Sequence, residues 1–146
     1  MPYALPTVAE FKTRFDRDFN YAVDQTDKTR VRDLDIQRGL DSANVNFNPG
    51  LWASQANFSE GFLLLSAHYL CTNILNSSQG LGGQGSWLVN SKAVGNVSSA
   101  FAIPDRILRS PFLSLLSKTL YGAEYLSIIA PLLVGNVRVV CGQTTP

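Results

Sequence analysis

Residues 54–76, SQANFSEGFLLLSAHYLCTNILN, decide the fold of this chain. Drawn as a helix, the segment carries apolar side chains on two sides, with Phe58, Phe62, Leu65 and Tyr69 on one and Leu63, Ala67, Leu70 and Ile74 on the other. A helix that is apolar nearly all round is buried. We therefore expect it at the centre of the fold, covered by other helices or by neighbouring subunits.

The charges of the chain are unevenly distributed. Residues 61–103 contain one ordinary charge, Lys92, and one histidine, His68, whereas residues 1–60 carry nine acidic and seven basic side chains. Charged residues make up 16% of the chain, below the roughly 25% of typical soluble proteins. A free domain could not cover its surface with so neutral a stretch, so we expect another subunit to cover part of it.

Composition also restricts the function. The net charge of +1 lacks the basic excess with which nucleic-acid-binding proteins contact phosphates. Cys71 and Cys141 are distant in sequence and form no CxxC pair, so we expect free thiols and neither a metal nor a cofactor. No apolar run is long enough to span a bilayer, and the opening MPYALPTVAEF lacks the pattern of a signal peptide. The sequence predicts a soluble chain made in the cytoplasm.

Helix signals flank the central segment on its N-terminal side. Thr7 and Glu10 match a capping box, and Val8, Phe11 and Phe15 then follow one face of a first helix.

A polar loop and a second helix come next. Phe19, Tyr21 and Val31 are the expected anchors of the loop, and either Asp33 or Asp35 is the expected N-cap of the helix. An Asn-Pro-Gly sequence then interrupts this helix.

The second half of the chain predicts a hairpin and two short helices. Residues 87–94 and 97–102 are rich in β-branched and aromatic residues and are joined by Gly95-Asn96, a two-residue turn signal. Ser110-Pro111 begins a further helix, and a last helix is expected after Tyr121-Gly122, ending at Pro131.

We therefore predict a mainly α fold, a small helical bundle in a single domain. Its parts are a helical core over about 7–80 and 105–131, a protruding β-hairpin over about 86–103 and an extended C-terminal tail over about 136–146.

Three possible catalytic or ligand-binding signals have simpler interpretations. The glycines of residues 80–85 match GxGxxG, but they follow a helix and precede a strand, the reverse of a dinucleotide site. Asp33 and Asp35 lack the glycine and glutamate of a calcium loop. His68 has no acid or nucleophile motif near it in sequence, so we expect a packed, hydrogen-bonded histidine.

A phage-type lysozyme is a further alternative. Its Glu-x8-Asp-x5-Thr pattern, started at Glu10, reaches Phe19 where the aspartate should stand, and Asp18 is one residue short. One residue turns a side chain by about 100° around a helix, whereas the mechanism needs two carboxylates at a defined separation.

Four short motifs, in this order, resemble those of one bacteriophage family. Residues 35–43, DIQRGLDSA, resemble the DIQxALxxA of its second helix. Trp52 and residues 65–70, LSAHYL, resemble its tryptophan and AAHxL helix. Residues 91–98, SKAVGNVS, resemble its SxSVGxVS hairpin, and residues 121–126, YGAEYL, resemble its YGxxYL element.

The family is that of the head–tail adaptor proteins, also called connector or head-completion proteins, of long-tailed phages. Such proteins are helical, carry a protruding hairpin and form a ring, usually twelve-fold, beneath the portal. The resemblance implies a structural virion protein and not an enzyme, with DNA passing through the ring as non-specific cargo. It places the chain in the virion neck after assembly in the host cytoplasm, and it assigns family-motif positions to Trp52, His68, Tyr121 and Gly122.

The implied partners are further copies of the chain, the portal and a stopper or other tail-completion protein. The alternatives are that the chain is itself a stopper or terminator, or a lysozyme-like phage enzyme. The tail is the expected portal-binding segment, through Val137, Arg138, Val139, Val140 and Cys141. The hairpin is expected to contact a neighbouring subunit or the stopper, through Trp87, Lys92, Val94, Gly95, Asn96 and Val97.

Overall fold

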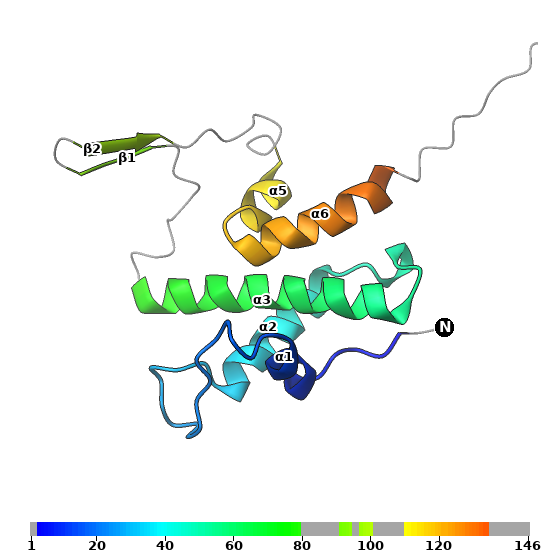
Figure 1. Ribbon diagram of the computed structural model, residues 1–146, viewed down its shortest axis with the longest axis horizontal. Coiled ribbons are helices and arrows are strands. Elements are labelled where there is room, and N and C mark those ends of the chain that lie inside the picture. Colours follow the sequence, from blue (N-terminus) through cyan, green and yellow to red (C-terminus); the bar gives the residue numbers. More distant parts are fainter. Residues whose placement is uncertain (1–2, 80–90, 95–96, 101–109, 135–146) are drawn as a thin grey trace, which may run out of the picture.

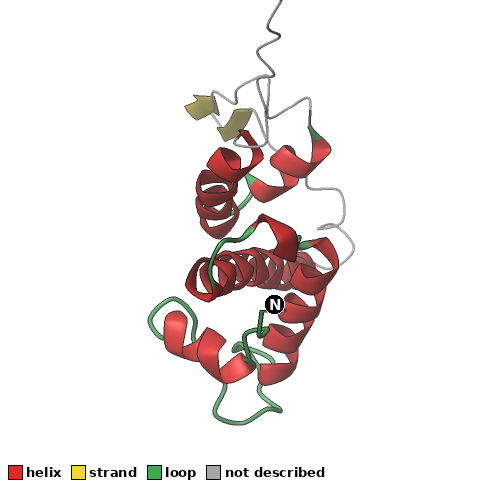
Figure 2. Cartoon of the chain, turned by 90° about the vertical axis from the view of Figure 1, so that its right-hand side faces the viewer, coloured by secondary structure: helices red, strands yellow, loops and turns green. Residues whose placement is uncertain are grey.

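The structure, a computed structural model, describes residues 3–79, 91–94, 97–100 and 110–134. Most of this part is made of helices, namely α1 (Val8–Arg14), α2 (Asp33–Asn46), the single 3₁₀ turn η1 (Pro49–Leu51), α3 (Gln55–Gln79), α5 (Pro111–Leu116) and α6 (Leu120–Val134). α3 is the axis, with α1 and α2 on one side of it and α5 and α6 on the other (Figure 1). A view along α3 shows the same layers (Figure 2). The prediction of a mainly helical fold is confirmed for the described residues.

The central helix is buried because other helices pack on both of its sides. Every residue of 61–68 is buried, and Leu65, Ala67 and Leu70 are fully enclosed. The flanking elements complete this core with Phe11, Phe15, Ile36, Leu40, Ala43, Phe47, Leu116, Tyr125 and Ile129. Full burial of each large apolar side chain contributes about 1.5–3 kcal/mol. The all-round apolar pattern of α3 thus reflects contacts within the chain.

The first two helices begin with different caps. Thr7 and Glu10 form the predicted capping box, in which the Glu10 carboxylate accepts the Thr7 backbone N–H at 2.7 Å. For α2 the prediction was wrong, because the N-cap residue is Arg32 and both aspartates lie in the first turn. Asp35 accepts the Arg32 backbone N–H at 3.2 Å and its guanidinium at 3.0 Å. It therefore stabilises the helix start from three residues inside the helix.

The last helix differs from the prediction at both ends. α6 begins at Leu120, before the Tyr-Gly pair, because the Thr119 hydroxyl caps it by accepting the Gly122 N–H at 3.0 Å. At the other end Pro131 lies inside the helix, which continues to Val134. A proline inside a helix removes one backbone hydrogen bond and crowds the carbonyl one turn before it, at a cost of about 3 kcal/mol, which the core packing of Tyr125 and Ile129 in the same helix offsets.

The loop between α1 and α2 is anchored as predicted. Val31 is buried, and Phe19 and Tyr21 are partly buried against the core. Tyr21 and Val31 form an isolated parallel bridge, in which the Ala22 N–H donates to the Val31 carbonyl at 2.9 Å and the Val31 N–H donates to the Asn20 carbonyl at 3.0 Å.

Two short strands lie between α3 and α5 in the sequence. β1 (Ser91–Val94) pairs with β2 (Val97–Ala100) in antiparallel fashion, with Val94 opposite Val97. The turn at 95–96, the rest of the expected hairpin and the tail over 136–146 lie outside the described residues. The protruding arm and the extended tail therefore stay predictions.

Candidate functional site

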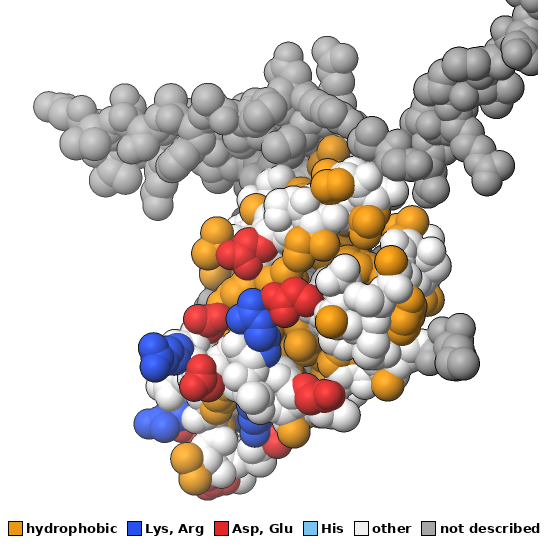
Figure 3. All heavy atoms as spheres, turned by 45° about the vertical axis from the view of Figure 1, so that its right-hand side comes forward, with side chains coloured by type: hydrophobic (Ala, Val, Ile, Leu, Met, Phe, Trp, Pro, Cys, Tyr) orange, Lys and Arg blue, Asp and Glu red, His pale blue; other side chains and the backbone are white. Residues whose placement is uncertain are grey.

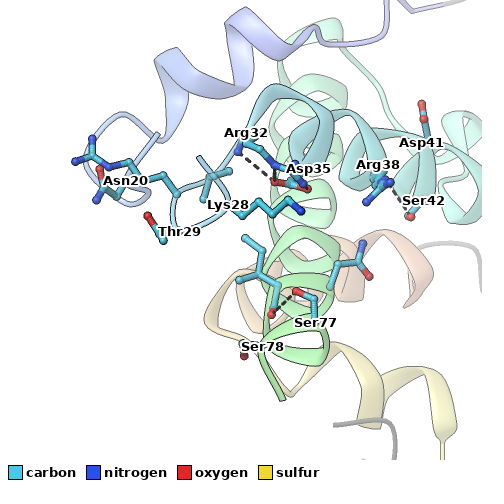
Figure 4. A pocket seen from close by; sticks show the side chains of 14 residues that line it. Asn20, Lys28, Thr29, Arg32, Asp35, Arg38, Asp41, Ser42, Ser77 and Ser78 are labelled. Atoms are coloured by element: carbon cyan, nitrogen blue, oxygen red, sulfur yellow. Dashed lines mark hydrogen bonds and ion pairs between the residues drawn. The ribbon is translucent and has the colours of Figure 1, made fainter. Parts of the chain in front are cut away.

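A basic groove of about 1030 Å³ lies between the loop before α2, α2 itself and the last turns of α3 (Figure 4). Val31 and Ile74 give it apolar surface. Ser42 on α2 and Ser77 and Ser78 on α3 add hydroxyl groups to its walls. The recess thus combines a small apolar area with polar and charged sides.

The loop that forms one wall of this basic groove is held by its own side chains. The Asp24 carboxylate accepts the Thr26 backbone N–H at 3.0 Å, and the Asp27 carboxylate accepts the Thr29 backbone N–H at 2.9 Å. Turns closed by aspartate in this way keep a loop in one shape. With the bridge at Tyr21, they give the groove an ordered rim.

Cations outnumber anions in the groove. Its lining contains Lys28, Arg30, Arg32 and Arg38 against Asp35 and Asp41. Arg32 is hydrogen-bonded to Asp35 at 3.0 Å, and Arg30 is 3.5 Å from Asp27 outside the lining. Among the described residues no ion pair holds Lys28 or Arg38, and Lys28 extends from the loop across the groove (Figure 4). The groove is therefore a local excess of positive charge within the acidic half of the chain.

This charge arrangement is suited to binding an anionic group. The hydrogen bonds from Arg32 lower the pKa of Asp35, so this carboxyl stays ionised at neutral pH. A general acid at pH 7 needs the opposite shift. The groove can hold a carboxylate-bearing or phosphate-bearing partner through Lys28 and Arg38.

Glu10, the acid of the lysozyme alternative, is occupied by the helix cap. Hydrogen bonds from the backbone and the hydroxyl of Thr7 lower its pKa. A glycosidase acid needs a raised pKa, so this environment does not favour an acid role for Glu10.

His68 and Gly122, two of the four family-motif residues, lie together in the core, away from the basic groove. His68 on α3 has no exposed surface, and its Nδ1 is 2.7 Å from the Thr119 Oγ1 that also caps α6 at Gly122. Burial, with a smaller contribution from the charge of Lys118, lowers the pKa of His68 to about 4. The expectation of a packed, hydrogen-bonded histidine is confirmed, and its position joins α3 to the start of α6.

The other two motif residues are also packing residues. Trp52 stacks on Phe47 with ring centroids 5.1 Å apart, and its ring touches the position where Gly61 has no side chain. Tyr121 packs edge-on against Phe15 at 5.4 Å. The four motif positions thus hold the layers together and do not line the basic groove.

The other predicted contact residues cannot be compared with the structure. The tail residues 137–141, together with Trp87, Gly95 and Asn96, lie outside the described residues. Lys92, Val94 and Val97 belong to the described strands, but the structure does not describe their side chains.

The sequence interpretation missed the basic groove. Lys28, Arg30 and Arg32 are three cations within five residues, in the turn that leads into α2. That cluster was the available signal. It did not reveal Arg38 or the α3 serines, which only the packing of α2 on α3 brings to the same place.

The surface outside the groove is divided by polarity. Acidic and basic side chains gather on the part formed by α1, α2 and their loop, whereas apolar and uncharged side chains cover most of the part around α5 and α6 (Figure 3). Residues 110–134 contain two charges, Lys118 and Glu124. Phe112 is 42% exposed and Leu120 is 72% exposed. We call the part formed by α5 and α6 the neutral flank and the opposite part the charged flank.

Comparisons with known proteins give no family assignment, since no protein-family model matches the chain and no curated protein is found similar to it. None of the helices in the described part is long and apolar enough to cross a membrane. The same residues hold no group of three or more His, Cys, Asp or Glu side chains that could bind a metal ion.

Proposed function

We propose that this chain is a structural subunit of a bacteriophage neck. In this proposal it forms a ring, twelve-fold as in the family its motifs resemble, beneath the portal and above a stopper or other completion protein. DNA passes through the ring, and assembly takes place in the host cytoplasm before the ring becomes part of the virion.

The observation that carries the proposal is the division between the charged and neutral flanks. A subunit in a closed ring contacts its two neighbours through two different surfaces. The neutral flank exposes Phe112 and Leu120 on helices with little charge. Surfaces of this kind are characteristic of protein–protein contacts.

The charged flank supports the second contact of such a ring. Leu34 on α2 is 52% exposed and Val45 is 83% exposed. They are eleven residues apart, so a helix of 3.6 residues per turn brings them to the same side. This side of α2 can therefore offer apolar contacts within a polar rim.

The charge of the chain supports the role of a DNA channel. Each phosphate that a protein neutralises adds salt-dependent affinity, and a channel must let DNA slide. A net charge of +1 per subunit keeps that affinity low, and sequence-specific contacts are not expected.

The test is quantitative mass spectrometry of purified virions of the source phage, with the portal as internal standard. We expect as many copies of this chain as of the portal. Its absence from the particle would overturn the proposal and would direct attention to the enzyme alternative, tested by lytic assays of the chain and its Glu10→Gln variant.

Chemical cross-linking of the same virions separates an adaptor from a stopper or terminator. An adaptor should give cross-links to the portal through exposed lysines such as Lys28. Cross-links to other neck proteins and none to the portal would favour the stopper or terminator alternative.

A further inference from the structure

The charged flank contains a second recess with chemistry opposite to that of the basic groove. This apolar pocket, of about 420 Å³, lies between the segment before α1 and the exposed side of α2. Pro6, Leu40 and Phe62 are buried and form its inner surface. Leu5 at its edge is 51% exposed, so an apolar surface remains available to an occupant.

The rim of the apolar pocket carries one negative charge and several hydrogen-bonding groups. Asp41 is the charged residue, and its carboxylate accepts the Gln37 amide N–H at 2.9 Å. Asn44, one turn further along α2, adds an amide. A short apolar segment with one positive charge would match this pocket. Its backbone could form hydrogen bonds with the amide side chains on the rim.

The C-terminal tail of this chain has that composition. Residues 135–146 read GNVRVVCGQTTP, in which valines surround Arg138, the one charged side chain. At up to about 3.3 Å per residue, these twelve residues can reach about 40 Å beyond the end of α6. Asp41 lines both recesses, but in the basic groove it lies among four cations that would repel Arg138, whereas in the apolar pocket it is the one charged residue.

We infer that residues 137–141 of one copy occupy the apolar pocket of the neighbouring copy, with Arg138 beside Asp41. α6 and α2, which lines the pocket, lie on opposite sides of α3 (Figures 1 and 2). The tail of the same chain would have to pass around α3 to reach its own pocket, so we take the donor to be a second copy. The inference rests on the proposed ring and deepens it, since a repeated exchange of tails links each subunit to the next. It also assigns the tail to a neighbouring subunit, where the sequence had suggested the portal.

Cross-linking between position 44 and Cys141 tests the inference. In the full chain with Cys71→Ser, an Asn44→Cys change places a thiol at the pocket rim and leaves Cys141 in the tail. A short bismaleimide should then produce a ladder of covalent oligomers, both in concentrated protein and in particles that carry the variant. The matched control is Asn46→Cys, also exposed on α2 but absent from the pocket lining, which should give at least fivefold less product.

Mixing ¹⁵N-labelled and unlabelled chains identifies the donor. Cross-linked peptides that join a ¹⁵N-labelled chain to an unlabelled chain show that the tail binds to another copy. The inference is overturned if the linkage occurs within single chains, if tail cross-links go to the portal alone, or if no ladder forms in either preparation.

Charge exchange gives an independent readout. Asp41→Arg should lower the yield of the position 44–141 cross-link about fivefold, the size of effect expected for one exposed ion pair. Adding Arg138→Asp should restore the yield, whereas Asp16→Arg on the same flank should leave it unchanged. A double variant no better than Asp41→Arg alone would contradict the pairing of Arg138 with Asp41.

The two proposals fail in distinguishable ways. If virions lack the chain but the ladder forms, tail exchange holds and the neck assignment fails. If copy number equals that of the portal but the ladder is absent, the neck assignment holds and the tail binds elsewhere.

Discussion

At Gly122, the addition of a single methyl group has a clearly predictable effect on the free energy of unfolding. A Cβ at this position would lie 2.0 Å from the Leu116 carbonyl oxygen and 2.8 Å from His68 Nδ1. The carbonyl belongs to backbone that cannot move without shifting α5, so we expect Gly122→Ala to lower the free energy of unfolding by about 3 kcal/mol. Urea denaturation followed by circular dichroism measures this.

Gly50 provides the matched control for that substitution. A Cβ at Gly50 would meet the Asn48 side-chain oxygen alone, at 3.3 Å. The Gly50→Ala variant should differ from the parent chain by less than about 1 kcal/mol. Equal free energies of unfolding for the two variants would show that the stability of the fold does not depend on the close packing of α6 on α5.

His68 makes stability depend on pH. Its pKa falls from 6.5 in the unfolded chain to about 4 in the folded one, because burial disfavours the charged ring and the charge of Lys118 adds to this effect. The unfolded chain therefore binds a proton first as the pH falls. The contribution of the neutral ring is complete above pH 6.5 and is lost towards pH 4, a change of about 3 kcal/mol.

The measurement is the free energy of unfolding at pH 7 and pH 5 for the parent chain and for His68→Asn. An asparagine can still bond to Thr119 and does not titrate, so the variant should lose most of the decrease seen between these pH values. Carboxylates such as Asp35 contribute equally to both proteins. An unchanged pH dependence in the variant would assign the effect to those carboxylates.

At the scale of the secondary-structure element, the capping box of α1 deserves a direct test because this helix has seven residues. Thr7→Ala removes the hydroxyl that accepts the Glu10 N–H at 3.3 Å, which should cost about 1 kcal/mol. The control is Thr13→Ala, whose hydroxyl bonds back to the Ala9 carbonyl within the helix. Since alanine is the better helix former, Thr13→Ala should not reduce stability, and thermal unfolding compares the two.

The sequence could predict the start of a helix where the residues that determine it are close together in the chain. The start of α5 was predictable, because the Ser110 hydroxyl accepts the Leu113 N–H at 3.4 Å and Pro111 occupies the first helical position. The start of α6 was not, because the Thr119 cap works together with Gly122, whose missing side chain makes room for the Leu116 carbonyl. Such a contact between two helices leaves no local pattern.

The same reasoning explains why the candidate site was only partly visible. The cluster of Lys28, Arg30 and Arg32 is local in the sequence, whereas Arg38 and Ser77 are brought to it by packing. The family-motif residues were recognisable as a pattern, and the structure gives them a packing role.

For the whole molecule, the charge asymmetry of the sequence becomes a division of the surface. Residues 1–60 carry a net charge of −2 and build the charged flank, and α5 and α6 build the neutral one (Figure 3). The middle of the central helix needs no neighbouring subunit, since residues 61–68 are buried within the chain. The outer side of α5 and α6 is therefore the neutral surface that we expect one neighbouring subunit to cover, with α2 on the charged flank as the second contact.

That conclusion predicts the effect of one charge at Leu120, which is 72% exposed at the first position of α6. Leu120→Glu should not destabilise the monomer, because an acidic residue is favourable at a helix N-terminus and the side chain is already largely in water. It should reduce incorporation into virions at least tenfold, since burying an unpaired carboxylate in a subunit contact is costly. The matched control is Ala56→Glu, an exposed position in the first turn of α3, and copy number relative to the portal is measured by mass spectrometry. If the Leu120 variant enters particles as well as the Ala56 variant does, the neutral flank is not the contact between subunits, and the ring must be built from other surfaces.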